Sequence, residues 1–529
     1  MSKKIASMNT KKELKLANNF FNTGDYLNAE KILKNILKAD RSNAEVLYQL
    51  GLVAYKVKNI NKAIDIINKA INIKASEEYY INLGSIFFEQ KKFDDAIDCF
   101  EKAIETKPDC FSAYNNLGVA YEKKEMTDKA INCYKKALEL NSNYAEAYCN
   151  LGVSYKNKGQ IDSAIEYYLK AISINPKSAV SNYNLGIAYM IKRDIITAIK
   201  YYIEAIKMDP SYTDTYLNLG IAYLLAKNFK QGWKYYEWRF HGKRESAPKI
   251  SNPKPRWKGD SLKDKIIYVY YEQGIGDTIQ FVRFLPILKS LGAKKVLFKC
   301  QTGLEKLLKL GNFNIDIVDN STNDELIEFD TYISLLSIPG VLNIEYNNIP
   351  KTTEYLKPDI NKVIKYKQKF FANDKFKIGI FWQGSLEHKS DKERSIPLEY
   401  FYPLFKLSGI EIYSLQKGYG IEQLNKIPKE FNIIDLGSTF NDFSDTAAAI
   451  ENLDLVITID SAVAHLAGAM GKPVWIILPL NLEWRWFVDE KETVWYKSAR
   501  LFRPEPEKSK RDLIEYICKE LCEKLNCIS

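Results

Sequence analysis

Three short segments in the C-terminal half carry residue types that bind phosphorylated ligands or move protons. The first, residues 272–277 (EQGIGD), has two glycines, Gly274 and Gly276, that let the backbone turn tightly and approach a ligand. Asp277 then begins a helical stretch, where a carboxylate serves either as a helix cap or as a general base for a hydroxyl. The GxGD spacing differs from the GxGxxG of dinucleotide sites.

The second segment, residues 460–468 (DSAVAHLAG), predicts an anion site at the start of a helix. An N-cap Ser461 followed by the small residues Ala462 and Val463 would leave backbone N–H groups facing a phosphate. Asp460 precedes them, and His465, a candidate catalytic residue, lies one turn into the helix, facing back to the site. An ordinary N-cap with a core histidine is the alternative interpretation.

The third segment, residues 382–397 (WQGSLEHKSDKERSIP), contains two cations, Lys392 and Arg394, either of which would neutralise a diphosphate. It also holds Glu387 and His388. A charged surface loop explains the same residues equally well.

The elements that must position these segments alternate between short β-rich runs and helical stretches. The strands are predicted at 266–271, 295–300, 315–319 and 331–336, and then at 377–382, 410–415, 453–460 and 473–479, with a final helix at 510–525. Such alternation predicts two parallel sheets covered by helices, in lobes at 263–360 and 374–529. Each of the three segments follows a strand, and ligands bind at the carboxyl ends of such strands.

The N-terminal half has an internal repeat of about 34 residues. A Leu-Gly pair ends at Gly51, Gly84, Gly118, Gly152, Gly186 and Gly220, with alanines at fixed distances after most of these glycines. Small residues let antiparallel helices approach closely, so the pattern predicts an α-solenoid of about seven helix pairs in residues 1–240. A proline-containing linker is predicted at 241–262.

Asparagine occurs two residues before five of the repeat glycines, at Asn82, Asn116, Asn150, Asn184 and Asn218. Equivalent positions stack along a solenoid, so these amides would form a ladder. An amide both donates and accepts, so the ladder could hold the backbone of an extended peptide. Support of repeat packing is the alternative.

The repeat resembles the tetratricopeptide (TPR) family. Residues 460–466 resemble the D-S/T-x-x-x-H-L signature of the heptosyltransferase-like glycosyltransferases (family nine), residues 274–277 resemble their G-x-G-D loop, and WQG…RSIPL resembles their phosphate-contacting loop. Together with GWKYYEWRF, SLQ-x-G, DFSDTAAAI and EWRW, these pieces resemble bacterial TPR–glycosyltransferase fusions, some linked to flagellin modification. The resemblance covers nearly the whole chain, although the first lobe is short for this family.

The resemblance implies a GT-B fold and transfer of a sugar from a nucleotide sugar to a polypeptide in the TPR groove, with inversion or retention left open. Asp277 would be the base, Asp460 would hold a sugar hydroxyl, and Gln416 would touch the base or ribose of the nucleotide. No Asp-x-Asp occurs in the sequence, so neither a metal nor another cofactor is expected. Two alternatives are a protein-interaction scaffold with a non-catalytic nucleotide-binding domain and a lipid-linked oligosaccharide acceptor.

Composition is that of a globular protein, with 46% hydrophobic and 27% charged residues. The net charge of +10 is spread along the chain, which favours solvated helix faces over a nucleic-acid surface. The N-terminus has no apolar signal region, and the longest apolar run is too short to span a membrane. With eight dispersed cysteines, these features predict a cytoplasmic protein.

Overall fold

The computed structural model describes residues 2–241, 254–311, 313–350, 354–387, 391–505 and 508–525. The chain divides into two compact units. The first comprises residues 1–192 and 207–209, and the second comprises residues 193–206 and 210–529. The first contains most of the repeats, and the second contains most of the helix at 195–208, the last helix pair and both sheets.

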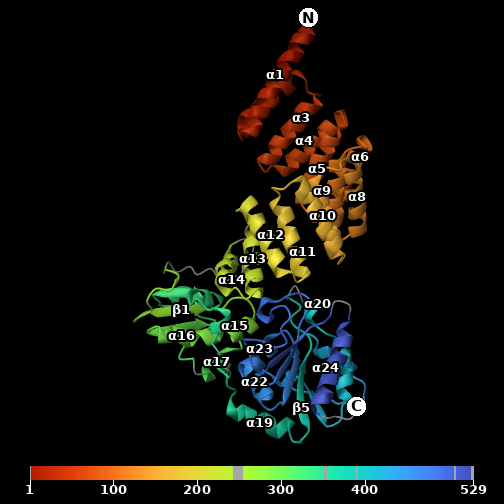
Figure 1. The fold of residues 1–529 in the computed structure, drawn as a ribbon. Coiled ribbons are helices and arrows are strands. Elements are labelled where there is room, and N and C mark those ends of the chain that lie inside the picture. The colour runs from red at the N-terminus through yellow and green to blue at the C-terminus, as the bar shows by residue number, and fades with distance from the viewer. Residues whose placement is uncertain are drawn as a thin grey trace. The chain divides into compact units, whose positions relative to one another are not determined.

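The repeats form antiparallel pairs of helices in which a 13-residue helix alternates with a 14-residue helix over most of the array (Figure 1). The helices are α1 (Ser2–Asn22), α2 (Tyr26–Ala39), α3 (Ala44–Lys56), α4 (Ile60–Ile73), α5 (Glu77–Glu89), α6 (Phe93–Thr106), α7 (Phe111–Lys123), α8 (Thr127–Leu140), α9 (Ala145–Asn157), α10 (Ile161–Ile174), α11 (Ala179–Ile191), α12 (Ile195–Met208), α13 (Thr213–Leu225) and α14 (Phe229–Tyr236). The predicted α-solenoid is therefore confirmed.

The repeat glycines lie where the two helices of a pair touch. A Cβ atom at Gly118 would lie 2.5 Å from Cε1 of Tyr134, and the same holds for Gly152 and Tyr168. These tyrosines are fully buried, and so are the repeat alanines, for example Ala130. The sequence period thus follows from close helix packing, in which any side chain at the glycine would displace a buried ring.

A row of ion pairs joins successive repeats at their turns. Lys124 pairs with Asp94, Lys158 pairs with Asp128 at 2.7 Å, and Lys192 pairs with Asp162 at 2.5 Å. Each pair joins residues 30 positions apart and recurs after 34 residues. All three aspartates are well exposed, so each pair contributes little to stability.

The last helix pair packs on the α/β part of the second unit. Trp233 of α14 donates its indole N–H to the carbonyl of Ile344 at 2.8 Å, and its ring meets Trp484 edge-on at 5.4 Å. Tyr236 also contacts Trp484, at 5.9 Å. The last helix pair therefore belongs to the second unit, together with most of α12, whereas the sequence predicted a domain boundary at residue 240.

Two parallel sheets follow, one in each lobe. The first has the order β3-β2-β1-β4 and consists of β1 (Ile266–Tyr270), β2 (Lys295–Lys299), β3 (Asp316–Val318) and β4 (Thr331–Ser334). The second has the order β10-β9-β8-β5-β6-β7 and consists of β5 (Phe376–Phe381), β6 (Ile410–Ser414), β7 (Ile434–Asp435), β8 (Leu455–Ile459), β9 (Val474–Ile477) and β10 (Ala499–Phe502). The predicted parallel α/β architecture is confirmed, and strands β7 and β10 are additional to it.

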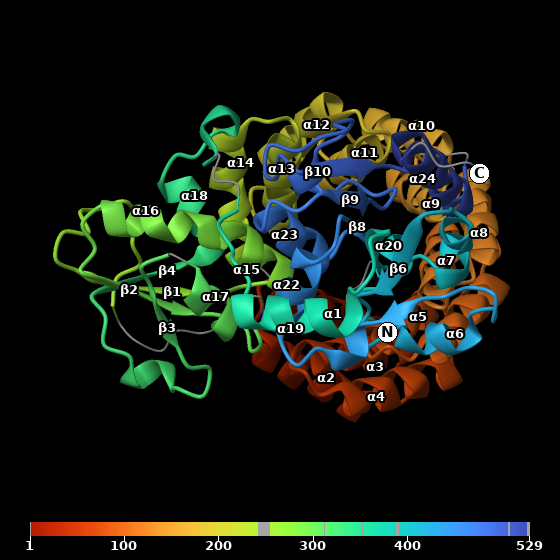
Figure 2. The same ribbon diagram turned by 90° about the horizontal axis from the view of Figure 1, so that it is seen from below.

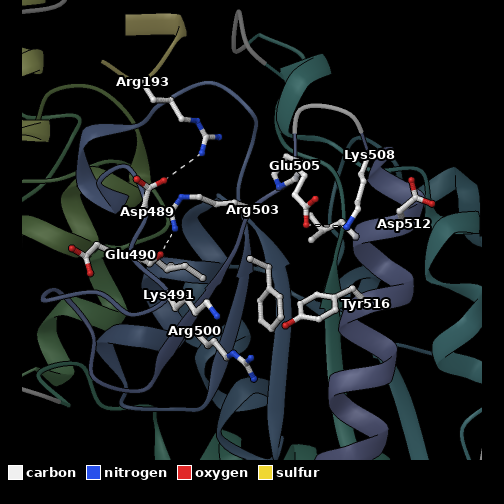
Figure 3. A pocket seen from close by; sticks show the side chains of 14 residues that line it. Arg193, Asp489, Glu490, Lys491, Arg500, Arg503, Glu505, Lys508, Asp512 and Tyr516 are labelled. Carbon is white, nitrogen blue, oxygen red and sulfur yellow. Dashed lines mark hydrogen bonds and ion pairs between the residues drawn. The ribbon is translucent and has the colours of Figure 1, made fainter. Parts of the chain in front are cut away.

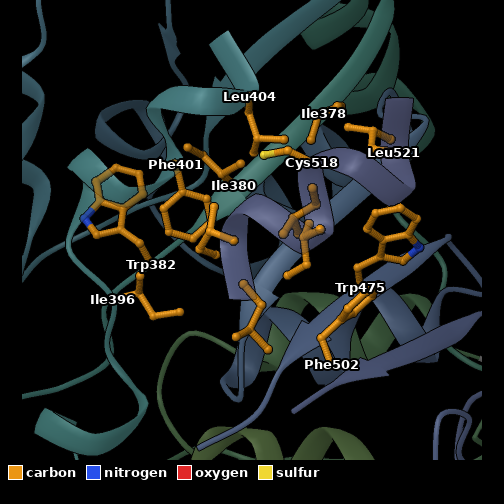
Figure 4. Close-up of a cluster of buried hydrophobic side chains, with 14 of the residues drawn as sticks. Ile378, Ile380, Trp382, Ile396, Phe401, Leu404, Trp475, Phe502, Cys518 and Leu521 are labelled. Atoms are coloured by element: carbon orange, nitrogen blue, oxygen red, sulfur yellow. The ribbon is translucent and has the colours of Figure 1, made fainter. Parts of the chain in front are cut away.

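Short helices cover the sheets. They are α15 (Ile275–Phe281), α16 (Leu285–Ser290), α17 (Glu305–Leu310), α18 (Ile338–Val341), α19 (Ile360–Phe370), α20 (Asp391–Arg394), α21 (Tyr402–Phe405), α22 (Phe443–Glu451), α23 (Ala462–Ala469) and α24 (Lys510–Leu525). Helices α15 and α23 lie between the two sheets (Figure 2). The second sheet packs on α24 through a core that includes Ile380, Trp475 and Cys518 (Figure 4).

Candidate functional site

Asp277 lies in the first turn of α15, directly after the loop that follows β1. Its Oδ2 accepts a hydrogen bond from the backbone N–H of Gly274 at 2.9 Å, and its Oδ1 is bound by Arg485. The helix begins at Ile275, so Asp277 is not the helix-opening residue that the sequence suggested but caps the helix from inside its first turn. Burial raises the pKa of Asp277, and the charge of Arg485 opposes this rise.

Arg485 is a site residue that the sequence reasoning missed. It belongs to the short helix η9 (Trp484–Trp486), is buried, and binds Asp277 with Nη2 and Glu483 with Nη1. Its guanidinium also lies 4.6 Å from the centre of the Trp484 ring. Burial disfavours its charge, but Asp277 and Glu483 outweigh this and raise the pKa of Arg485. Arg485 therefore joins the second lobe to the carboxylate of the first.

His465 lies in α23 at the centre of the same cluster. A Cβ atom at Gly276 would lie 2.7 Å from Cδ2 of His465, so the glycine is what allows the two lobes to meet here. His465 shares a hydrogen bond with the Tyr496 hydroxyl through Nδ1 (2.9 Å) and stacks on Trp486 at 5.2 Å. Its Nε2 lies 4.0 Å from Oδ1 of Asp460. Burial lowers the pKa of His465 well below its usual value, so the ring is neutral.

Asp460 directly follows β8 and faces this histidine with a side chain that is 19% exposed. Burial is the largest cause that raises the pKa of Asp460, to about 6, and Glu483 adds to the rise. Trp486, Arg485 and Arg394 act in the opposite direction. A carboxyl group with this pKa is mostly ionised at neutral pH, and its ionised form destabilises the folded state.

We expect Asp460→Asn to stabilise the second unit at pH 7. Because the folded carboxyl binds its proton more tightly than the unfolded one, stability is lost as pH rises from about 4 to about 6. The neutral amide avoids this loss, and the free energy of unfolding should rise by about 3 kcal/mol at pH 7 and by about half as much at pH 5. Urea unfolding at both pH values measures it. Asp316→Asn, on the exposed surface of β3, is the control and should change nothing, while an unaltered or lower stability of Asp460→Asn at pH 7 would contradict the expectation.

The start of α23 follows Asp460 and Ser461 occupies its N-cap position, as the sequence predicted, but the Ser461 side chain makes no capping hydrogen bond. The Ser461 hydroxyl instead shares a hydrogen bond with Thr458 Oγ1 at 3.1 Å. Ala462 is half-buried and Val463 is buried in the first turn. The backbone N–H groups of this turn are therefore not bound by the cap side chain.

Arg394 and Lys392 differ in their relation to this cluster. Nη1 of Arg394 donates to the backbone carbonyl of Asp460 at 3.4 Å, and its Nε donates to the buried Asp391 at 3.2 Å. Lys392 is exposed on α20. The sequence left open whether Lys392 or Arg394 reaches the site, and in the structure it is Arg394.

Gln416 is not available to a nucleotide, contrary to the prediction. It is buried, its Oε1 accepts the backbone N–H groups of Trp382 and Gln383, and its Nε2 donates to the carbonyls of Gln383 and Tyr419. All its hydrogen-bonding groups are used to hold the loop after β5. Gln416 therefore fixes the conformation of the loop after β5 through hydrogen bonds to its backbone.

Three other titratable residues of the sequence segments 272–277 and 382–397 have different outcomes. Glu272 is buried and its oxygens bind Arg239 at 2.8 and 2.6 Å, so it holds the end of the last repeat against β1 rather than facing a substrate. His388 lies outside the described residues, and Glu387 is exposed.

The ladder asparagines are all half-buried, so they are neither enclosed in the helix pairs nor fully exposed. In the first unit, Asn82 donates to the Tyr48 hydroxyl at 2.8 Å, Asn150 to Asn115 at 3.0 Å and Asn184 to Cys149 at 3.6 Å. Each bond reaches one repeat back, so the amides support repeat packing while remaining accessible. Asn116 lies on α7, and Asn218 lies on α13 in the second unit.

The described residues contain no group of three or more His, Cys, Asp and Glu side chains arranged to hold a metal ion. Within the same part of the chain, no helix combines the length and apolarity needed to cross a membrane.

Comparisons with known proteins bear mainly on the repeats. The family described as "Tetratricopeptide repeat" matches residues 145–178 and 167–200, and "TPR repeat" matches 84–125 and 127–159. "Anaphase-promoting complex, cyclosome, subunit 3" matches 16–103. A curated relative, Protein FlbA of Caulobacter vibrioides, is 26% identical over 294 residues. The match covers 50% of this chain, which spans about half (48%) of that relative's length.

Similar solved structures include MamA, with 32% identity, a TM-score of 0.29, and coverage of 30% of this chain and 95% of MamA. PilF of Pseudomonas aeruginosa has 19% identity, a TM-score of 0.36, and coverage of 40% of this chain and 96% of its own. The family matches and the helix pairs agree. The N-terminal half of this chain is an array of tetratricopeptide repeats, a scaffold for protein interactions.

Proposed function

We propose that the α/β part is a glycosyltransferase that moves a sugar from a nucleotide-sugar donor to a polypeptide held by the repeats. The observation that supports this is one cluster in which Asp277 of the first lobe pairs with Arg485 of the second, Gly276 packs against His465, and His465 faces Asp460. Asp277 and Asp460 follow the carboxyl ends of β1 and β8, the edge at which parallel sheets bind ligands.

In this proposal the donor diphosphate binds the first turn of α23. The backbone N–H groups after Ser461 face the phosphate oxygens, and Arg394, bound to the Asp460 carbonyl, supplies the positive charge. The Asp460 carboxylate holds a sugar hydroxyl. No metal takes part, since backbone dipoles and arginine neutralise the leaving group.

Asp277 acts as the general base. Although Gly274 and Arg485 each bind one of its oxygens, every carboxylate oxygen has two lone pairs and can accept the acceptor hydroxyl as well. Burial raises its pKa, which makes it a stronger base. His465 was expected from the sequence to be catalytic; in this proposal the neutral, buried ring is instead a positioning residue that keeps Asp460 and the Gly276 loop in place.

The acceptor in this proposal is an extended polypeptide bound along the asparagines of the repeats, in keeping with the protein-binding role of tetratricopeptide arrays. A second candidate function is a scaffold whose α/β part binds a nucleotide without catalysis. Both carboxylate oxygens of Asp277 already accept hydrogen bonds within the protein, which favours the non-catalytic scaffold.

The test measures binding of UDP-, GDP-, ADP- and CMP-sugars and of acceptor peptides selected on the isolated full-length chain. Ser461→Glu puts a like charge beside the diphosphate and should abolish donor binding while peptide binding stays intact. The triple replacement of Asn116, Asn150 and Asn184 by Ala is the reciprocal control and should weaken only the peptide.

Transfer of labelled sugar to the peptide by the unaltered protein is the decisive result for catalysis. Donor binding without transfer would support the scaffold instead. Unchanged donor affinity in Ser461→Glu would exclude the start of α23 as the phosphate site.

A further inference from the structure

A cavity of about 500 Å³ lies in the second unit beside the edge strand β10 and the beginning of α24 (Figure 3). Its walls come from Arg193 in the turn before α12, from residues 489–491, from residues 500–505 and from one side of α24. None of its lining residues belongs to the Asp277–Asp460 cluster. Its volume suits a ligand of small-molecule size.

Among the described residues, no carboxylate lies at hydrogen-bond distance from two guanidinium groups at one end of this cavity. Arg503 donates to the backbone carbonyls of Trp486, Phe487 and Glu490. Arg193 lies 3.7 Å from Asp489, and its Nη2 is buried without a hydrogen-bond partner among the described residues. Burial, and next the charge of Arg193, lower the pKa of Arg503 to about 10. An anion between Arg193 and Arg503 would accept hydrogen bonds from both guanidinium groups.

The acidic residues around the cavity are mostly engaged elsewhere. Glu505 pairs with Lys508 at 2.9 Å, Glu490 pairs with Lys227, and Asp512 accepts two hydrogen bonds from Ser509. Asp489 is the carboxylate beside the arginines, and its side chain is 84% exposed. Counting the described residues, the arginine end therefore carries a net positive charge.

The other end of the cavity is aromatic and apolar. The rings of Phe502 and Tyr516 lie 6.2 Å apart, with Leu513 beside them on α24. Tyr516 is 46% exposed, so a ring of the ligand has a free aromatic surface to contact.

We propose that this cavity binds a small aryl or heteroaryl phosphate, with the phosphate between Arg193 and Arg503 and the ring against Phe502 and Tyr516. Nucleoside monophosphates and simple aryl phosphates share this chemistry. Because Arg193 forms the turn before α12, the bound ligand links that repeat turn to β10 and α24.

Calorimetric titration of the full-length protein with phenyl phosphate, adenosine monophosphate, inorganic phosphate and phenol tests the proposal. Phenyl phosphate should bind saturably, with inorganic phosphate weaker and phenol not detected, and adenosine monophosphate shows whether a nucleoside is accepted. Arg193→Gln should weaken phenyl phosphate about tenfold or more, since it removes a charge-assisted hydrogen bond. Tyr516→Ser should weaken phenyl phosphate but not inorganic phosphate.

Two controls keep the site distinct from the donor site and from a general charge effect. Ser461→Glu and the exposed Arg41→Gln should both leave phenyl phosphate binding unchanged. Absence of saturable phenyl phosphate binding, equal effects of Arg193→Gln and Arg41→Gln, or loss of binding in Ser461→Glu would each overturn the proposal.

Discussion

Replacement of Asp277 by asparagine is expected to lower the turnover of the proposed transfer by about 10²–10⁴-fold, the usual contribution of a general base. The amide keeps the size of the side chain and can still accept from Gly274, but it cannot take a proton from the acceptor hydroxyl. Donor affinity should be unchanged, because the diphosphate contacts lie on α23. Single-turnover rates and donor titrations measure the two quantities separately.

The ion pair with Arg485 requires a control, since Asp277→Asn also removes that contact and lowers stability. Arg485→Met breaks the same pair but leaves the carboxylate. Without Arg485 the pKa of Asp277 rises further, so the limb of the pH profile of kcat/KM that reports this base should move to higher pH. In Asp277→Asn that limb should disappear. Full activity of Asp277→Asn would remove this residue from the mechanism and leave His388 as the next candidate.

The second large effect, on stability, is expected at the buried ion pair between Arg239 and Glu272. Glu272→Gln should lower the free energy of unfolding of the second unit by about 3–5 kcal/mol, because it leaves the Arg239 charge in the interior without its main partner. Arg239 follows the last repeat and Glu272 follows β1, so the loss should be seen both in α14 and in the sheet. Hydrogen exchange of the two elements measures it.

The double variant Arg239→Met with Glu272→Met separates pairing from packing. Replacing both charges by apolar groups of similar volume should recover most of the loss. Asp128→Asn, which breaks an exposed pair between two repeats, should leave stability almost unchanged. If Glu272→Gln behaved like Asp128→Asn, the Arg239 contact would not hold the last repeat in place.

The fold could be predicted largely from the sequence because its signals are local. The helix pairs follow from glycine and alanine contacts between neighbours in sequence, and the long strands follow from apolar runs such as the one that became β8. Strand β10 was missed because its four residues (ARLF) contain an arginine and follow an irregular segment. The boundary at residue 240 missed the attachment of the last helix pair because Trp233 meets its partners, Ile344 and Trp484, only in the folded chain.

The candidate site could be predicted only in part, because the missing information is long-range. Asp277 and Arg485 are 208 residues apart, and no periodicity relates them. Gln416 and Arg394 both follow strands in the sequence. The Gln416 amide is fully hydrogen-bonded to backbone groups, whereas the Arg394 guanidinium reaches Asp460. Sequence alone does not distinguish a polar side chain that faces a ligand from one that holds a loop.

The row of lysine–aspartate pairs in the repeats has a consequence for how such a chain can change. Because Lys124, Lys158 and Lys192 each pair with the aspartate of the preceding repeat by the same rule, removing or duplicating a whole interior repeat restores the pairing at the new junction. The last repeat has no such interchangeability, since Trp233 and Arg239 are fitted to the sheet-bearing unit. Interior repeats can therefore be exchanged as whole units to alter what the array binds. The final helix pair can be exchanged only together with the α/β domain that follows it.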